Sequence, residues 1–499
     1  MYKRHTGQVS MLESPEMFGS LPLDPNNNWI RLSKLVPWRE FDLKYADQFR
    51  SRKGQRAIDS RMALGALLIK PAYKALSDED ITKEIAMNPY LQYFLGLHEY
   101  RYECPFDPSM MTRFRQRITP EMLAWVNDRI IGRESEQNGS DDKDDRDDGH
   151  ADEDQAEENQ AREGEEEKNE GTMILDATCA PQDIRFPTDT SLLNEAREKA
   201  EEIIDDLHEM GLSEGKKPRT YRKKARRKYN SFSKSRKKTV QMIRTTIRQQ
   251  LGYLRRDLGI IDDYELRHPG CLQKLSSRQE TMLQVLRTLY SQQESMYRTG
   301  SHKVPDRIVS LSQSWVRPIV RGKQTADVEF GAKVEMSVVD GFLRIEDLRW
   351  DAFNESTTLR QSVEDYRKAY GHYPARVLAD TIFRTRENLK YCKEHGIHLN
   401  GPKLGKPFAD PAEARRQRKL EWLESGERGE IERNFGVGKR RYSLDRIVTK
   451  LKETSEVMIH SIVVYMNLRK RLRLLLRAFF IRLRMMIHNR RREVEFTLA

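Results

Sequence analysis

The chain has 499 residues, a formal net charge of +12 and charged side chains at 33% of its positions. This length exceeds one typical domain, so two or three domains are expected. The charge is uneven, because residues 134–170 hold eighteen Asp/Glu against four Lys/Arg, and the rest of the chain therefore carries +26. A chain whose other residues are this basic usually binds a polyanion, and nucleic acid is the commonest one. Ribosomal, membrane-surface and heparin-type binding remain open.

Cysteine usage and hydropathy exclude several classes. The four cysteines are far apart in the sequence, which argues against a disulfide framework and against a cysteine zinc motif. The longest apolar stretch, residues 457–466, is too short to span a bilayer, and the N-terminus lacks the apolar core of a signal peptide. These features predict a soluble, cytoplasmic protein without a membrane partner.

Residues 1–133 are predicted to form an N-terminal helical domain. Apolar residues recur at helical spacing over 55–132, and Ser77 followed by Asp80 is close to a capping box. A third short helix is expected after Ser109. Short helices with exposed Arg and Lys suit a helix-turn-helix-like DNA module, although such units also serve as packing platforms.

The acidic segment 134–170 contains no aliphatic or aromatic residue larger than alanine. It cannot bury a core and is predicted to be a disordered linker. A sharper hypothesis is that it imitates DNA and blocks the basic surface until DNA displaces it.

Residues 171–467 are predicted to form an α/β domain. An apolar strand begins near 173, and helical periodicity follows over 191–300, which indicates a large helical insertion. From 327 the apolar residues alternate, so a half-buried strand is expected, with a turn at Asp340-Gly341 leading into the next strand. Helices and short strands then alternate. Without the insertion, this order predicts a mixed sheet flanked by helices.

A strongly basic run lies inside the insertion. Residues 216–238 hold thirteen Lys/Arg and no acid. Runs of charged residues are usually solvated surface. A run that is entirely basic favours contact with phosphates, because Lys and Arg side chains that bind a nucleic acid release its condensed counterions. The DNA-binding candidates in this run are Arg222, Lys223, Arg226 and Arg227.

Two apolar runs end in an acid, at Asp176 and at Asp380. In layered α/β folds, ligands gather at the carboxyl ends of strands. Such an acid can also simply cap the next helix, but two in one domain favour a functional site.

A third acid is expected on a helix around 427–442. There Arg428, Glu432 and Lys439 fall on one stripe of the helix, whereas Glu427 and Glu430 point elsewhere and are expected to be solvated. Three glycines, each costing roughly 1 kcal/mol, mean that this helix needs tertiary support. Three carboxylates at one sheet edge would suit Mg²⁺, and two such ions can activate a water or a 3′-hydroxyl on a phosphodiester.

Several motifs together resemble the DDE transposases of bacterial insertion sequences, the insertion-sequence-five group. They include "ILDAT", "VVDGFLRIEDLRWDAFNE", "VLADTIFRTRENLKYCKEHGIHLNGPKLGKP" and "ERGEIERNFGVGKRRYSL". The resemblance covers about 172–467, and the helices at 55–132 resemble that group's N-terminal domain.

The resemblance implies a ribonuclease-H-like catalytic fold with Asp176, Asp380 and Glu432 as the catalytic, metal-binding triad. The family's signature of Tyr, Arg, Glu and Lys matches at Arg428, Glu432 and Lys439, but its tyrosine position is Ser425. Lys403, Arg428 and Lys439 are then expected to bind DNA. The metal would be two Mg²⁺ ions, for which Mn²⁺ can substitute.

The implied reaction is cleavage at terminal inverted repeats and 3′-hydroxyl attack on target DNA, by a homodimer on DNA at the nucleoid. A related nuclease that cuts without joining, and an inactive transposase-derived DNA-binding protein, are the alternatives.

Residues 468–499 form the last predicted segment, in which 468–492 mix a wide apolar face with ten Lys/Arg. A basic amphipathic helix can lie on a membrane surface. Packing as the last helix of the core, with its cations on DNA, fits the other features better.

Overall fold

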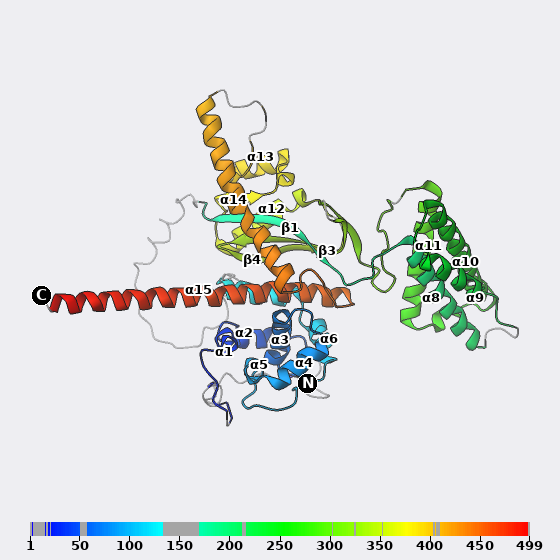
Figure 1. Cartoon of the computed structure of the whole chain (residues 1–499), viewed down its shortest axis with the longest axis horizontal. Coiled ribbons are helices and arrows are strands. Elements are labelled where there is room, and N and C mark those ends of the chain that lie inside the picture. The colour runs from blue at the N-terminus through cyan, green and yellow to red at the C-terminus, as the bar shows by residue number, and fades with distance from the viewer. Residues whose placement is uncertain are drawn as a thin grey trace, which may run out of the picture.

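The computed structural model describes residues 2, 15, 18–19, 21–49, 57–132, 169–211, 216–301, 303–323, 326–351, 353–402, 405 and 410–497. Most of the acidic segment, residues 133–168, and Lys403 lie outside these described residues. Figure 1 shows a helical domain at the N-terminus, a central sheet with helices, and a separate helical lobe, with one long helix running between the first two.

The N-terminal helices form one packed unit. Ser77 and Asp80 form the predicted capping box, whereas Ser109 precedes its helix without a capping hydrogen bond. The buried residues of this unit share a cluster with Val457, Val464 and Leu468 of the long C-terminal helix. These helices therefore provide a packing platform for that helix. They are α1 (Asn28–Ser33), α2 (Trp38–Ala46), α3 (Ser60–Ile69), α4 (Asp78–Met87), α5 (Pro89–Phe94), α6 (Met110–Arg117) and α7 (Pro120–Ile131).

The central sheet is mixed. Its order is β2-β3-β1-β5-β6, with β4 also paired to β3; β1 is antiparallel to β3 and parallel to β5. This confirms the predicted mixed α/β fold, which is consistent with a ribonuclease-H-like domain. The sequence interpretation missed β2. The strands are β1 (Thr172–Pro181), β2 (Arg317–Lys323), β3 (Ala326–Val339), β4 (Phe342–Arg349), β5 (Arg376–Ala379) and β6 (His398–Leu399).

The turn between β3 and β4 is the predicted one. Asp340 and Gly341 both have positive φ, at 51° and 77°, as a tight two-residue hairpin requires.

Helices cover both faces of the sheet. Ile174 and Leu378 pack towards α14 (Pro411–Arg441), whereas Leu175 and Val377 pack towards α12 (Leu359–Tyr370) and α13 (Arg386–Glu394). The expectation of a half-buried strand at 327–339 was therefore wrong for its second half. Glu335 is fully buried on the α12 face, where Thr358 and Ser362 donate hydrogen bonds to it. Burial raises the pKa of Glu335 to about 7.

Four helices lie between β1 and β2 and form the lobe on the right of Figure 1. They are α8 (Asp189–Glu209), α9 (Arg222–Lys234), α10 (Val240–Arg267) and α11 (Ser277–Thr299). Leucines and isoleucines of α8, α10 and α11 build a separate hydrophobic cluster. The lobe thus has a core of its own, which we call the insertion core.

The last helix, α15 (Lys452–Thr497), is continuous across the boundary expected at 467/468. Its first half is buried against both the N-terminal helices and the sheet, down to Leu472. From Leu474 to Met486 its large apolar side chains other than Leu476 are exposed, and Figure 1 shows this end projecting from the molecule. The expectation that 468–492 packs as a core helix holds as far as Leu476 and was wrong for residues 477–486, while the side chains of 487–492 lie outside the described residues. No described helix is long and apolar enough to cross a membrane.

Candidate active site

Asp176 lies in the middle of β1 and not at its end, so the sequence interpretation of a strand-terminal acid was wrong here. The strand continues because residues 176–181 pair with β3, up to Pro181 opposite Gly331. On its other side, β1 pairs with β5 only as far as Leu175 opposite Ala379. Asp176 is therefore the first β1 residue beyond the β5 pairing, next to Asp380, which follows Ala379.

Asp380 does end its strand, as expected, and it also caps a helix. Its carboxylate accepts a hydrogen bond from the backbone N–H of Thr381 at 2.6 Å, at the start of the 3₁₀ helix η8 (Thr381–Phe383). The residue remains exposed. Capping and a functional role, which the sequence presented as alternatives, are thus compatible here, since one carboxylate oxygen stays available.

Helix α14 brings the third carboxylate to the same place. Arg428 Nη2 lies 3.3 Å from Glu432 Oε1, and Arg428 Nη1 lies 3.9 Å from Asp176 Oδ2. Arg428 therefore bridges an acid of the sheet and an acid of the helix. The side chain of Glu432 is 58% exposed, against 17% for Asp176, so the cluster opens to solvent on the helix side.

The position of α14 depends on ion pairs to the sheet and to α15. Glu427 pairs with Arg376 of β5 at 3.0 Å, and Glu430 pairs with Lys470 at 3.6 Å. Both glutamates remain partly solvated, as expected, with side chains 46% and 38% exposed, and the structure adds an ion pair to each of them. Buried Glu424 adds a 2.6 Å contact to His398 of β6.

Apolar contacts complete the support that the glycine-containing helix requires. Ile431 and Phe435 are buried in the cluster beneath the sheet. A Cβ at Gly438 would lie 3.1 Å from Leu444 and 3.3 Å from Met466, so this glycine permits a close approach between α14, the following turn and α15. The partners in these contacts are far apart in sequence, and no local pattern could have indicated them.

The electrostatics of the cluster favour a cation. Burial raises the pKa of Asp176 to about 6, while the Ala177 N–H and Arg428 act in the opposite direction. The charges of Glu355 and Asp380 add to the increase, which places both acids within electrostatic reach of Asp176. Glu355 itself is paired with Lys333 at 2.7 Å.

Carboxylate oxygens are hard donors of the type that Mg²⁺ prefers, so the residue types at this place are those of a magnesium site. Even so, no group of three or more His, Cys, Asp or Glu side chains within the described ranges is arranged closely enough to hold a metal. Arg428 lies between Asp176 and Glu432 and supplies positive charge there.

The remaining predicted residues lie in three different settings. Lys439 is two turns along α14 from Glu432, and its Nζ is 3.9 Å from Glu329 of β3. Lys223, Arg226 and Arg227 are exposed on α9, which lies in the lobe on the right of Figure 1, apart from β1 and α14. Lys403 falls outside the residues that the structure describes.

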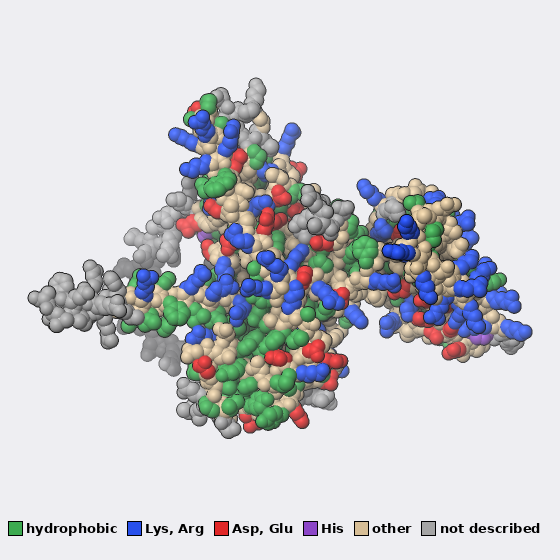
Figure 2. All heavy atoms as spheres, viewed as in Figure 1, with side chains coloured by type: hydrophobic (Ala, Val, Ile, Leu, Met, Phe, Trp, Pro, Cys, Tyr) green, Lys and Arg blue, Asp and Glu red, His purple; other side chains and the backbone are tan. Residues whose placement is uncertain are grey.

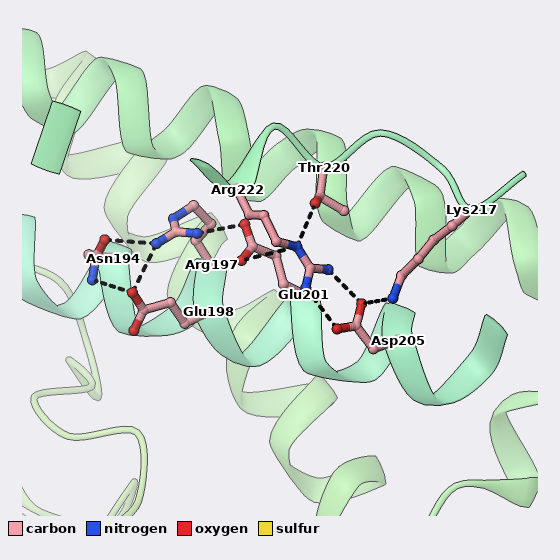
Figure 3. A network of polar contacts seen from close by, with 8 residues as sticks. All are labelled: Asn194, Arg197, Glu198, Glu201, Asp205, Lys217, Thr220 and Arg222. Carbon is pink, nitrogen blue, oxygen red and sulfur yellow. Dashed lines mark hydrogen bonds and ion pairs between the residues drawn. The ribbon is translucent and has the colours of Figure 1, made fainter. Parts of the chain in front are cut away.

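Arg222 is different from its neighbours on α9. Its two terminal nitrogens donate to the two oxygens of Asp205 at 2.8 and 2.5 Å, and Glu201 lies 4.0 Å away (Figure 3). These contacts raise the pKa of Arg222 and hold the side chain against α8. The structure therefore corrects the expectation that Arg222 is available to bind DNA.

Two family models match the chain. A transposase domain of the DUF772 type matches residues 20–117, and a transposase DDE domain matches residues 377–469. An uncharacterised protein, ORF8 in the nfe locus of Rhizobium meliloti, is 34% identical over 101 residues, which cover 20% of this chain and 48% of that protein. The chain thus spans about half the length of this curated relative, and no solved structure matches it significantly. One transposase model thus matches the N-terminal helices and another matches the segment that carries Asp380 and Glu432, so the chain is similar to transposase domains in two separate segments.

Proposed function

We propose that this protein cleaves DNA at the ends of an insertion sequence and joins the released 3′-hydroxyl to target DNA. The observation that carries the proposal is the meeting of β1, β5 and α14, where Asp176 follows the last β1–β5 pair, Asp380 ends β5, and Arg428 links Asp176 to Glu432. In this proposal the three acids are the catalytic residues.

Asp176, Asp380 and Glu432 would hold two Mg²⁺ ions, or Mn²⁺ in their place. Bound divalent ions activate a water or a 3′-hydroxyl and stabilise the leaving oxygen of a phosphodiester. Arg428 orients Asp176 and Glu432 through its two nitrogens, and it can contact a phosphate when an ion displaces it from the carboxylates. Lys439, on the same stripe of α14, would hold the DNA backbone next to the reacting bond.

Additional DNA contacts would come from the insertion. Figure 2 shows Lys and Arg side chains gathered over this lobe, and Lys223, Arg226 and Arg227 are exposed there. Cations that neutralise phosphates release counterions, which gives salt-dependent affinity for DNA of any sequence. A homodimer would bring two element ends together and place the insertion of each copy along the DNA.

The test uses DNA that flanks the gene. Inverted repeats outside the reading frame supply the substrate, and the full-length protein is incubated with it and with Mg²⁺. We expect nicked repeat ends and strand-transfer products, and we expect Asp380→Asn to abolish both while retaining DNA binding. Glu413→Gln, which neutralises an exposed acid at the other end of α14, is the matched control and should remain active.

Three outcomes decide between the proposal and its alternatives. Cleavage without any strand-transfer product would indicate a nuclease that cuts without joining. DNA binding without Mg²⁺-dependent cleavage would indicate an inactive DNA-binding protein derived from a transposase. Equal activity of Asp380→Asn and the unmodified protein would overturn the assignment of the site.

A further inference from the structure

The N-terminal half of α14 projects beyond the sheet, and its exposed side chains do not serve the packing described above (Figure 1). Residues 415, 416, 418 and 419 are all Lys or Arg, and all four are exposed. Arg415 and Arg418 form no ion pair with any residue that the structure describes. Figure 2 shows this end of the helix covered with basic side chains. The projecting half therefore carries a cluster of exposed cations on the same helix as Glu432.

The helical geometry aligns this surface with Glu432. At about 100° per residue, Arg415, Arg418, Trp422 and Glu432 fall within a sector of roughly 100°. A ligand that lies along this sector would touch the two arginines and the tryptophan before it reaches the carboxylate.

Trp422 is the unusual residue of the sector, because 74% of its surface is exposed. Beside its ring lies a shallow slot of about 390 Å³, which Leu423, Ser425 and Gly426 also line. A Cβ at Gly426 would meet nothing within 4 Å, so the slot is open on that side. A large flat ring held next to small residues on a rigid helix offers a platform for another flat group.

We propose that Trp422 stacks on an unpaired base of the DNA strand that Asp176, Asp380 and Glu432 act upon. This inference rests on the proposed function. Arg415 and Arg418 would hold phosphates on the side of Trp422 that faces away from Glu432, since stacking aromatics beside basic side chains are the common means of binding single-stranded nucleic acid.

The spacing sets where the base lies. Trp422 is ten residues from Glu432, a distance of about 15 Å along the helix. At about 3.4 Å per nucleotide of a duplex strand, the stacked base is roughly four nucleotides from the reacting bond. Trp422 is thus assigned as a positioning residue for an opened DNA end.

The experiment measures binding by the full-length protein without divalent ions, so that no cleavage occurs. One probe is a blunt duplex, and the other is the same duplex with a single-stranded overhang that carries 2-aminopurine, whose fluorescence falls on stacking. We expect Trp422→Ala to weaken overhang binding by about five- to a hundred-fold and to remove the fluorescence change, with blunt binding within about two-fold of the original.

Two variants control for loss of the helix. Trp422→Phe keeps an aromatic ring and should restore part of the overhang preference. Leu420→Ala removes an exposed apolar side chain on the opposite side of α14 and should have no effect on either probe.

The remaining outcomes separate this inference from the proposed function. If Trp422→Ala binds the overhang as tightly as the unmodified protein, or loses both probes equally, stacking is refuted while DNA binding stands. If Trp422→Ala changes only the oligomeric mass of the protein measured without DNA, the ring lies in an interface between protein copies and the inference fails. If the unmodified protein binds neither probe, the proposed function fails as well.

Discussion

Two regions of this protein gather acids around an arginine, and they differ chiefly in their exposure to water. At the candidate active site, Arg428 links Asp176 and Glu432, and the Glu432 side chain is 58% exposed. In the insertion, Arg197 is 1% exposed and donates to Asn194, Glu198 and Glu201 on its own helix (Figure 3).

The difference shows what each cluster can do. A buried arginine whose hydrogen bonds are made within one helix has no capacity for a ligand, and breaking such a pair leaves an uncompensated charge. The active-site acids outnumber their single arginine and face solvent, so they keep capacity for a further cation. Similar residue types therefore form a closed, buried network in one region and an exposed cluster that suits the proposed chemistry in the other.

The largest expected effect comes from removing the same charge in both regions. Glu432→Gln should lower cleavage by roughly a thousand-fold or more, because a metal ligand is lost, while thermal stability stays unchanged for so exposed a side chain. Glu201→Gln should leave cleavage per folded molecule unchanged but lower the free energy of unfolding by about 3 kcal/mol, because Arg197 loses its buried partner. Cleavage assays and thermal melts on both variants check this. A fall in stability for Glu432→Gln would contradict the comparison.

A second, smaller effect concerns pH. Asp257 of α10 is fully buried, and burial together with the charge of Glu201 raises its pKa to about 8. The unfolded value is about 3.9, so the folded state retains the proton between these values. The stabilisation that the protonated Asp257 carboxyl contributes is therefore fully present below pH 4 and is lost as the pH rises towards 8. Above pH 8 the stability no longer changes with this group.

Asp257→Asn should flatten this dependence and stabilise the insertion by about 2 kcal/mol at pH 8. Hydrogen exchange of the α8 and α10 amides at several pH values measures it. Asp263→Asn, on an exposed position of the same helix, is the control and should leave the profile as it is. An unchanged profile in Asp257→Asn would show that the carboxyl does not retain its proton in the folded protein.

The sequence predicted the helices and strands better than it predicted the contacts between them. Alternation and the Asp340-Gly341 turn were enough for β3 and β4, since both depend on neighbouring residues. Asp176 was misplaced within its strand because the β3 pairing that extends β1 comes from 160 residues further along the chain. The ion pairs of Glu427 and Glu430, and the burial of Glu335, likewise depend on contacts between distant segments. Local patterns indicate residue types and periodicity, but they cannot say which face a later helix will cover.

Arg222 gives the smallest and most specific test of the comparison, because it lies in the same basic run as Arg226 and Arg227. Replacing Arg226 and Arg227 with alanine should reduce the slope of log affinity against log salt for duplex DNA by up to about 1.8, since two exposed phosphate contacts are lost. Arg222→Ala should leave that slope unchanged and instead lower the melting temperature slightly, because Asp205 loses one of its two cationic partners and keeps Lys217. Titrations at several salt concentrations and a thermal melt distinguish these results. A reduced slope in Arg222→Ala would mean that DNA competes with Asp205 for this guanidinium, and that burial and pairing do not by themselves separate structural from functional charges.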